Sequence, residues 1–171
     1  MSNLQARPDW DSYFMAMAFL VAQRSPDQRT KHGSIIVDSF NHVLSTGYNG
    51  HPAGGDESIY DWTSDAKYSV ALHSEANSIL ACEHKPRGAK VYITGKPCSN
   101  CSLLLIQAGI KEIIYGPVES KMDIKWDLSS KLLANHGVSY RAFVGAQLRV
   151  PNGAVDILQI ALDKLTDLSK S

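Results

Sequence analysis

The chain has 171 residues, of which 44% are hydrophobic and 20% are charged, and its 17 Lys and Arg residues balance 17 Asp and Glu residues. This composition is typical of a globular domain and argues against a strongly electropositive nucleic-acid binder, because affinity for phosphate backbones comes mainly from clustered Lys and Arg. The N-terminal segment has no apolar signal region, no apolar run approaches the roughly 20 residues that span a bilayer, and an odd number of cysteines favours metal or thiol chemistry over a disulfide framework. We therefore expect one domain over residues 1–171, in the cytoplasm, with neither a membrane nor a nucleic acid as partner.

The first half of the chain predicts a helix followed by a hairpin. Apolar residues recur at helical spacing over residues 9–24 and predict one buried helical face, formed by Trp10, Phe14, Met17, Ala18 and Val21. Two short strands are expected at 34–37 and 42–46, joined by a tight turn around Phe40 and Asn41. Residues 47–70 are rich in glycine and show no period, so we expect a long loop of the kind that is usually functional or mobile.

The second half predicts alternating helices and strands. We expect a helix over 73–82, a strand at 90–94, and a helix that has Pro97 in its first turn and ends at Gly109. The apolar positions of the helix over 73–82 are Ala76, Ile79, Leu80 and Ala81. Strands at 111–116 and 138–143 flank a helical pattern through Ile124, Leu128, Leu132 and Leu133, and such a crossover predicts that these two strands are parallel.

The last segment, residues 149–171, breaks at Pro151-Asn152-Gly153 and then predicts an amphipathic helix through Leu158, Ala161, Leu162 and Leu165. Two interpretations of this helix stay open. It packs on the core of its own chain, or it forms a contact between subunits.

His73, Cys98 and Cys101 form a candidate metal site. Two thiolates and one imidazole suit zinc, and three protein ligands leave one tetrahedral position for water, as in catalytic sites. Cys98 and Cys101 are three residues apart at an expected helix start, so they point the same way. A closed structural site needs a fourth ligand, from Cys82 or His84. Because Cys82 lies about 13 Å along the helix axis from His73, we expect it to be a core thiol.

Glu75 is the candidate proton carrier of this site. It lies two residues beyond His73 in HSEANSIL, close enough to reach a metal-bound water without being a ligand. Two thiolates neutralise a zinc ion and limit how far it acidifies water, so a carboxylate that takes and returns protons is chemically sensible. This combination of His-x-Glu and Pro-Cys-x-x-Cys is typical of zinc-dependent nucleobase deaminases.

Beyond the metal ligands, the chain resembles the deoxycytidylate (dCMP) deaminases of the cytidine deaminase superfamily. WDSYFMAMAFLVAQRS, GYNGHPAGG, KYSVALHSEANSIL, VYIT, PCSNC and LLIQAGIKEIIYG follow the pattern of that family in order, in a family-like core of about 9–145. The resemblance implies an α/β class, three-layer α-β-α fold with a five-stranded mixed sheet whose fourth and fifth strands are parallel. It also implies a hydrolase that converts dCMP and water to dUMP and ammonia, with Glu75 moving the protons and one catalytic Zn²⁺ per subunit.

The resemblance also implies roles for residues outside the metal site. Arg29 matches an arginine that meets the substrate phosphate, Asn49 an asparagine beside the nucleotide, and Tyr115 a residue near the substrate at a strand end. Many relatives are homohexamers that dCTP activates and dTTP inhibits, each triphosphate bound with Mg²⁺ near the GYNG loop. By that resemblance Tyr48, Asn49 and Gly50 are allosteric candidates.

The chain departs from the family at several positions, and two alternative functions stay open. The regions RSPDQR and GYNGHPAGGDES lack the cysteines of many bacterial and phage relatives, so a second structural zinc is not expected. His32 and Ser34 stand where Val and Ala are usual, and Gly95-Lys96 where bulkier apolar residues are common. One rival is another deaminase of the superfamily, acting on free cytidine, tRNA adenosine or a riboflavin precursor. The other is a catalytically silent zinc module, in which Glu75 would have no function.

Overall fold

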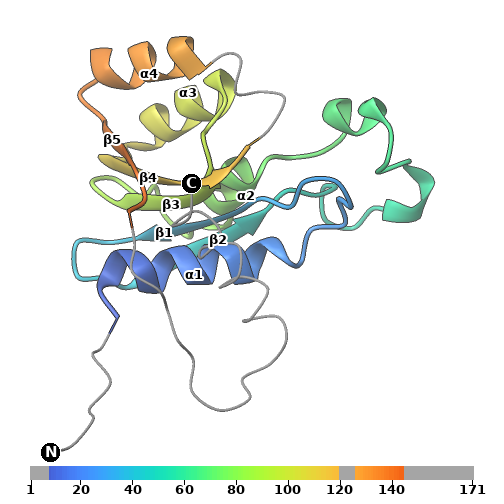
Figure 1. The fold of residues 1–171 in the computed structure, drawn as a ribbon, viewed down its shortest axis with the longest axis horizontal. Helices are drawn as coiled ribbons and strands as arrows, with labels where there is room; N and C mark the ends of the chain where they lie inside the picture. Colours follow the sequence, from blue (N-terminus) through green and yellow to red (C-terminus); the bar gives the residue numbers. More distant parts are fainter. Residues whose placement is uncertain (1–7, 120–125, 145–171) are drawn as a thin grey trace, which may run out of the picture.

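Five strands form one mixed sheet in the spatial order β2-β1-β3-β4-β5 (Figure 1). The computed structural model describes residues 8–119 and 126–144. In chain order its elements are α1 (Trp10–Ala22), β1 (Gly33–Val37), β2 (Val43–Tyr48), the 3₁₀ helices η1 (Glu57–Ile59) and η2 (Asp65–Ser69), α2 (Ser74–Ala81), β3 (Lys90–Gly95), α3 (Ser99–Ala108), β4 (Glu112–Val118), α4 (Trp126–Asn135) and β5 (Ser139–Ala142). Strand β1 pairs antiparallel with β2 and β3, whereas β3, β4 and β5 are parallel neighbours. The predicted mixed sheet and its parallel fourth and fifth strands are confirmed.

Helices cover both faces of this sheet (Figure 1). Helix α1 packs on one face, while α2, α3 and α4 follow one another across the other. Because side chains alternate along a strand, Ile35 and Val37 of β1 join the core under α1, and Ile36 joins the core that contains Leu105 of α3 and Leu133 of α4. The predicted three-layer arrangement is therefore confirmed.

Helix α1 begins and ends near its predicted bounds, but its buried face differs from the prediction. Phe14 and Ala18 are fully buried, as expected, whereas Trp10 is 55% exposed. The other buried apolar residues of the helix are Met15, Phe19 and Ala22. The sequence Phe-Met-Ala-Met-Ala-Phe-Leu is apolar all around the helix, so spacing alone does not identify the side that meets the sheet.

The helix predicted over 73–82 is confirmed as α2, but its buried residues are polar, and Ile79 is one of its apolar positions that packs against a core cluster. Ser74, Glu75 and Ser78 are buried, and Leu80 is 73% exposed. These polar groups are satisfied at the sheet, because Ser34 Oγ lies 2.8 Å from both the Ser74 carbonyl oxygen and Ser78 Oγ. The apolar spacing therefore predicts the helix but does not identify the polar residues that it buries.

Small residues allow α2 to lie close to the sheet. A Cβ atom at Gly47 of β2 would collide with the carbonyl oxygen of Ser74 and the backbone of Ser78. This close approach fixes the N-terminal end of α2, and with it Glu75, over the edge of β1 and β2.

Residues 47–70 are more ordered than the predicted long loop. Strand β2 continues to Tyr48, and the 3₁₀ helices η1 and η2 project to one side of the sheet (Figure 1). The side chains of Asp56 and Ser64 accept hydrogen bonds from the backbone at Ser58 and Ala66, and so begin these two turns. Such local caps explain why helical turns form without an apolar period.

The predicted hairpin turn and the predicted end of α3 are confirmed, whereas α3 begins later than predicted. Asn41 has a φ of 65° in the hairpin turn, and Gly109 ends α3 with a φ of 92°, a conformation that suits glycine. Pro97 precedes the N-cap residue Cys98, so it lies just before the first turn of α3 instead of within it. Ile124 and the C-terminal helix predicted over 149–171 lie outside the described residues.

Among the residues described, no helix is long and apolar enough to cross a bilayer.

Candidate metal centre and pocket

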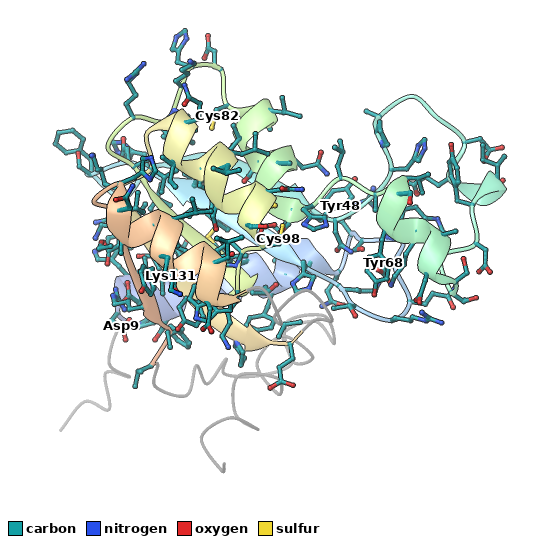
Figure 2. All side chains as sticks on the ribbon, turned by 90° about the horizontal axis from the view of Figure 1, so that it is seen from above. Asp9, Tyr48, Tyr68, Cys82, Cys98 and Lys131 are labelled. Carbon is teal, nitrogen blue, oxygen red and sulfur yellow. The ribbon has the colours of Figure 1, made fainter. Side chains whose placement is uncertain are left out.

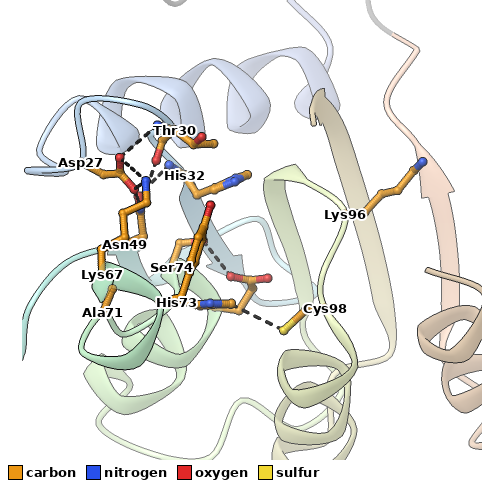
Figure 3. A pocket seen from close by; sticks show the side chains of 12 residues that line it. Asp27, Thr30, His32, Asn49, Lys67, Ala71, His73, Ser74, Lys96 and Cys98 are labelled. Atoms are coloured by element: carbon orange, nitrogen blue, oxygen red, sulfur yellow. Dashed lines mark hydrogen bonds and ion pairs between the residues drawn. The ribbon is translucent and has the colours of Figure 1, made fainter. Parts of the chain in front are cut away.

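Two helix starts bring the three predicted metal-ligand residues together. His73 is the N-cap residue of α2 and Cys98 that of α3, and neither side chain makes a capping hydrogen bond. Cys101 lies one turn into α3. Its Sγ is 3.4 Å from His73 Nδ1. The Sγ of Cys98 is 3.5 Å from the same nitrogen, as the dashed line in Figure 3 marks. Both N-cap side chains are therefore free to serve a ligand instead of the helix.

These distances fit a tetrahedral zinc ion. Zinc–sulfur bonds of about 2.3 Å and zinc–nitrogen bonds of about 2.0–2.1 Å place sulfur and nitrogen about 3.6 Å apart in a tetrahedron. The three ligand atoms all lie within 4.8 Å of one another, and no other such group of His, Cys, Asp and Glu occurs in the described part of the chain. The donor set and its spacing suit a site that keeps a fourth position for water.

The ligand side chains are linked by hydrogen bonds whose shared protons a bound cation would replace. A hydrogen bond from the Cys101 thiol lowers the pKa of Cys98, and a contact with His73 lowers it further. The same hydrogen bond raises the pKa of Cys101, with burial as the second cause, and the bond to Cys98 raises the pKa of His73. One thiol therefore ionises readily and the other holds the shared proton, which metal binding would displace.

Glu75 lies beside this group, in the first turn of α2. The residue is only 5% exposed, and it lines the same pocket as His73 and Cys98. The hydroxyl of Ser74 donates a hydrogen bond to Glu75 Oε2 at 2.9 Å. Burial and this hydrogen bond hold the carboxylate in one place, and a helix start favours its negative charge.

A buried ion pair forms the opposite wall of the pocket (Figure 3). Lys67 Nζ lies 2.7 Å from Asp27 Oδ1, and the two side chains are only 2% and 5% exposed. Asp27 also accepts hydrogen bonds from the backbone N–H groups of Arg29 and Thr30. Sequence reasoning missed this pair, because its members are far apart in the chain and neither belongs to a periodic pattern.

Asn49 lies in the pocket wall, and its amide groups hold that wall together. Its Oδ1 accepts from the backbone N–H of His32 at 2.7 Å, and its Nδ2 donates to the carbonyl oxygen of Thr30 at 3.0 Å. A longer contact of 3.4 Å reaches Asp27 Oδ2. The residue is thus at the pocket, and its contacts within the described residues organise the loop after α1.

The structure does not bring the other two predicted substrate residues to Glu75. Arg29 forms an ion pair with Asp65 at 3.0 Å, and its side chain is 47% exposed and outside the lining of the pocket. Tyr115 lines a second hollow, where its ring centroid lies 5.1 Å from that of Trp126. Burial is the main cause that raises the pKa of Tyr115. Their substrate roles stay predictions.

The remaining predicted allosteric residues flank Asn49 and join the pocket to neighbouring elements. The carbonyl oxygen of Tyr48 accepts from Asn77 of α2 at 2.7 Å, and the backbone of Gly50 pairs with Leu72. The GYNG segment therefore contacts Leu72, which precedes α2, and Asn77, which lies within it.

Cys82 lies apart from the metal-ligand group, at the other end of α2 from Cys98 (Figure 2). Its thiol donates to Ser45 Oγ at 3.1 Å, and its side chain packs against the core cluster of α3 and α4. The prediction of a core thiol is consistent with this position.

Comparison with known proteins places this site in a family. Residues 8–117 match the family described as "Cytidine and deoxycytidylate deaminase zinc-binding region". Human deoxycytidylate deaminase is 38% identical over 144 residues, which cover 80% of each chain, and that of Mycobacterium phage D29 is 40% identical over 129 residues, covering 67% of this chain and 99% of the phage protein.

A solved structure shows the same likeness in three dimensions. The dCMP deaminase of cyanophage S-TIM5, crystallised in complex with dCMP and dUMP, is 25% identical, covers 81% of this chain and 100% of its own, and superposes with a TM-score of 0.64. Sequence, fold and the His73, Cys98 and Cys101 group agree, and the chain belongs to the cytidine and deoxycytidylate deaminase family.

Proposed function

We propose that the protein catalyses hydrolytic deamination of dCMP to dUMP, with release of ammonia. The observation that carries this proposal is the convergence of His73, Cys98 and Cys101 with buried Glu75 at one pocket. Relatives named deoxycytidylate deaminase at 38% and 40% identity, and the structure of the cyanophage S-TIM5 dCMP deaminase with dCMP and dUMP, support the substrate.

His73, Cys98 and Cys101 would hold the zinc ion, which when bound supplies an acidified water and an electrophilic centre. Glu75 takes a proton from water at its carboxylate while the water oxygen bonds to the amine-bearing carbon, and it passes that proton to the adjacent ring nitrogen. It then takes the proton of the hydroxyl group formed at this carbon and gives it to the amine, which leaves as ammonia when the C–N bond breaks. Ser74 keeps the carboxylate oriented through its bond to Oε2.

A substrate panel tests this proposal. Zinc-loaded protein is offered dCMP, CMP, deoxycytidine and a short single-stranded DNA, and the loss of the cytosine absorbance is followed in the ultraviolet. We expect selective turnover of dCMP. Turnover of another member of the panel would support a different deaminase of the superfamily, and no turnover by zinc-loaded protein would support the structural zinc module.

We also propose regulation by nucleotides, with dCTP as activator and dTTP as inhibitor, each bound with Mg²⁺ at the segment Tyr48, Asn49 and Gly50. The support is positional, because Asn49 holds the pocket wall while Tyr48 contacts α2. Substrate saturation curves with each triphosphate and Mg²⁺ test this. Curves that neither nucleotide changes would contradict it.

Assembly into a homo-oligomer, a hexamer by resemblance, belongs to the same proposal. Leu80 of α2 and Leu103 and Leu104 of α3 are exposed apolar side chains on neighbouring helices, which supports a contact between subunits. The molar mass in solution, measured by light scattering, tests the oligomer. The free thiols of Cys82, Cys98 and Cys101 suit a reducing compartment such as the cytoplasm.

A further inference from the structure

We propose that Lys96 binds the phosphate group of the nucleoside monophosphate. This inference rests on the proposed function and adds a specificity-determining residue to the same pocket. Lys96 lies between the end of β3 and Cys98, and it lines both the pocket of Glu75 and the adjoining hollow of Tyr115. A ligand whose base lies at the metal group and whose phosphate extends toward the second hollow would pass this side chain.

Charge pairing singles out Lys96 among the nearby cations. Lys67 is buried and held by Asp27 at 2.7 Å, and Arg29 is paired with Asp65. For Lys96, no ion pair is found within residues 8–119 and 126–144, and its Nζ lies 5.8 Å from the ring centroid of Trp126. A phosphate forms charge-assisted hydrogen bonds that are stronger than such a distant cation–π contact. Lys96 is therefore the cation of this wall that can meet an anion without breaking an ion pair in the described structure.

The backbone just before Lys96 is irregular, where β3 ends beside β4. The β3–β4 register shifts between Ile93 and Gly95, and such bulges redirect the side chains that follow. The ring of His32 packs against Gly95, where a Cβ atom would lie 2.9 Å from His32 Cε1.

The lysine side chain needs to turn to reach a ligand in the pocket. Figure 3 shows Lys96 at the far side of Cys98 from Asn49 and Lys67, with its side chain directed away from His73. The flexible four-carbon stem of lysine allows the ammonium group to move from Trp126 toward the pocket rim. The phosphate lies at the opposite end of the nucleotide from the reacting carbon, so the ammonium does not have to approach the metal.

Binding of the product measures this contact without requiring turnover. Zinc-loaded wild type and the variants Lys96→Met and Lys96→Arg are titrated with dUMP and with deoxyuridine by calorimetry. We expect Lys96→Met to weaken dUMP binding roughly 10- to 100-fold, the usual loss for one charge-assisted hydrogen bond, while deoxyuridine binding stays the same. Lys96→Arg should restore most of the preference for dUMP. Lys85→Met, which removes an exposed lysine beyond α2, is the matched control and should change neither ligand.

The inference is overturned if Lys96→Met keeps the wild-type preference for dUMP, or if both ligands weaken equally. It is also overturned if Arg29→Met abolishes the preference and Lys96→Met does not, or if the wild type has no preference. Turnover of dCMP is measured separately on the wild type. A protein that prefers dUMP through Lys96 and yet leaves dCMP unchanged would contradict the proposed reaction and still support the phosphate contact.

Discussion

Removing the buried ammonium of Lys67 tests how the pocket wall is stabilised. At 2.7 Å from Asp27 Oδ1, the pair attracts with roughly 6 kcal/mol at an effective dielectric constant of about 20, before the cost of desolvation. Removal of one partner from a buried pair costs about 3–5 kcal/mol, because the other charge stays buried without compensation. We therefore expect Lys67→Met to lower the free energy of unfolding by that amount.

Urea unfolding of zinc-loaded protein at neutral pH measures this change. The double variant Asp27→Asn with Lys67→Met removes both charges and leaves an amide oxygen that accepts from the backbone N–H groups of Arg29 and Thr30. It should be more stable than Lys67→Met alone. Lys90→Met is the control, since Lys90 and Glu112 form a partly exposed ion pair at 3.1 Å whose loss should cost less than about 1 kcal/mol.

A cost for Lys67→Met as small as that of Lys90→Met would refute the reasoning. So would a double variant whose loss equals the sum of the losses of Lys67→Met and Asp27→Asn, each measured alone, because residues in a buried pair should show a coupling energy.

Substitutions at three further positions test the metal group, a helix cap and the close approach of α2. Cys98→Ala should bind zinc far more weakly, because it removes a ligand, and unchanged zinc content after dialysis would contradict the ligand role. Asp9→Ala should lower the free energy of unfolding by about 1 kcal/mol and Asp9→Asn by less, since Asp9 caps α1 through Ser12 N at 2.8 Å. The bond from Ser12 N lowers the pKa of Asp9, so the contribution of the carboxylate is present above its unfolded pKa and is lost as the pH falls through its folded pKa. A wild type and Asp9→Ala that lose stability in parallel on acidification would contradict this. Gly47→Ala should cost about 1–3 kcal/mol, because its methyl group meets the backbone of α2, and a thermal midpoint equal to that of the wild type would refute the close approach.

The metal site was predictable because its chemistry is local in the sequence. His73 and Glu75 are two residues apart, and Cys98 and Cys101 are one turn apart, so each half of the site has a motif of its own. The combination of the two motifs is typical of zinc-dependent nucleobase deaminases, and it predicted that the two halves meet. The sheet followed from β-branched runs and from the length of the crossover between β4 and β5. These features depend on neighbours along the chain.

What sequence reasoning missed depends on contacts between distant segments. The buried faces of α1 and α2 are chosen by what the sheet presents to them, including Ser34 and Gly47, and hydrophobic spacing does not contain that information. The ion pair of Lys67 with Asp27 has no sequence signature of its own. The position of Arg29, paired with Asp65, likewise depends on how two loops meet.

The most direct test of the proposed chemistry is the turnover of dCMP by Glu75→Gln, with the zinc content of the same sample measured. Glutamine keeps the shape of the side chain but cannot take and return protons, so we predict a loss in kcat of at least ~100-fold with zinc fully retained. The exposed Glu83→Gln serves as control and should match the wild type. A Glu75→Gln protein that retains zinc and turns over dCMP at the wild-type rate would contradict the account.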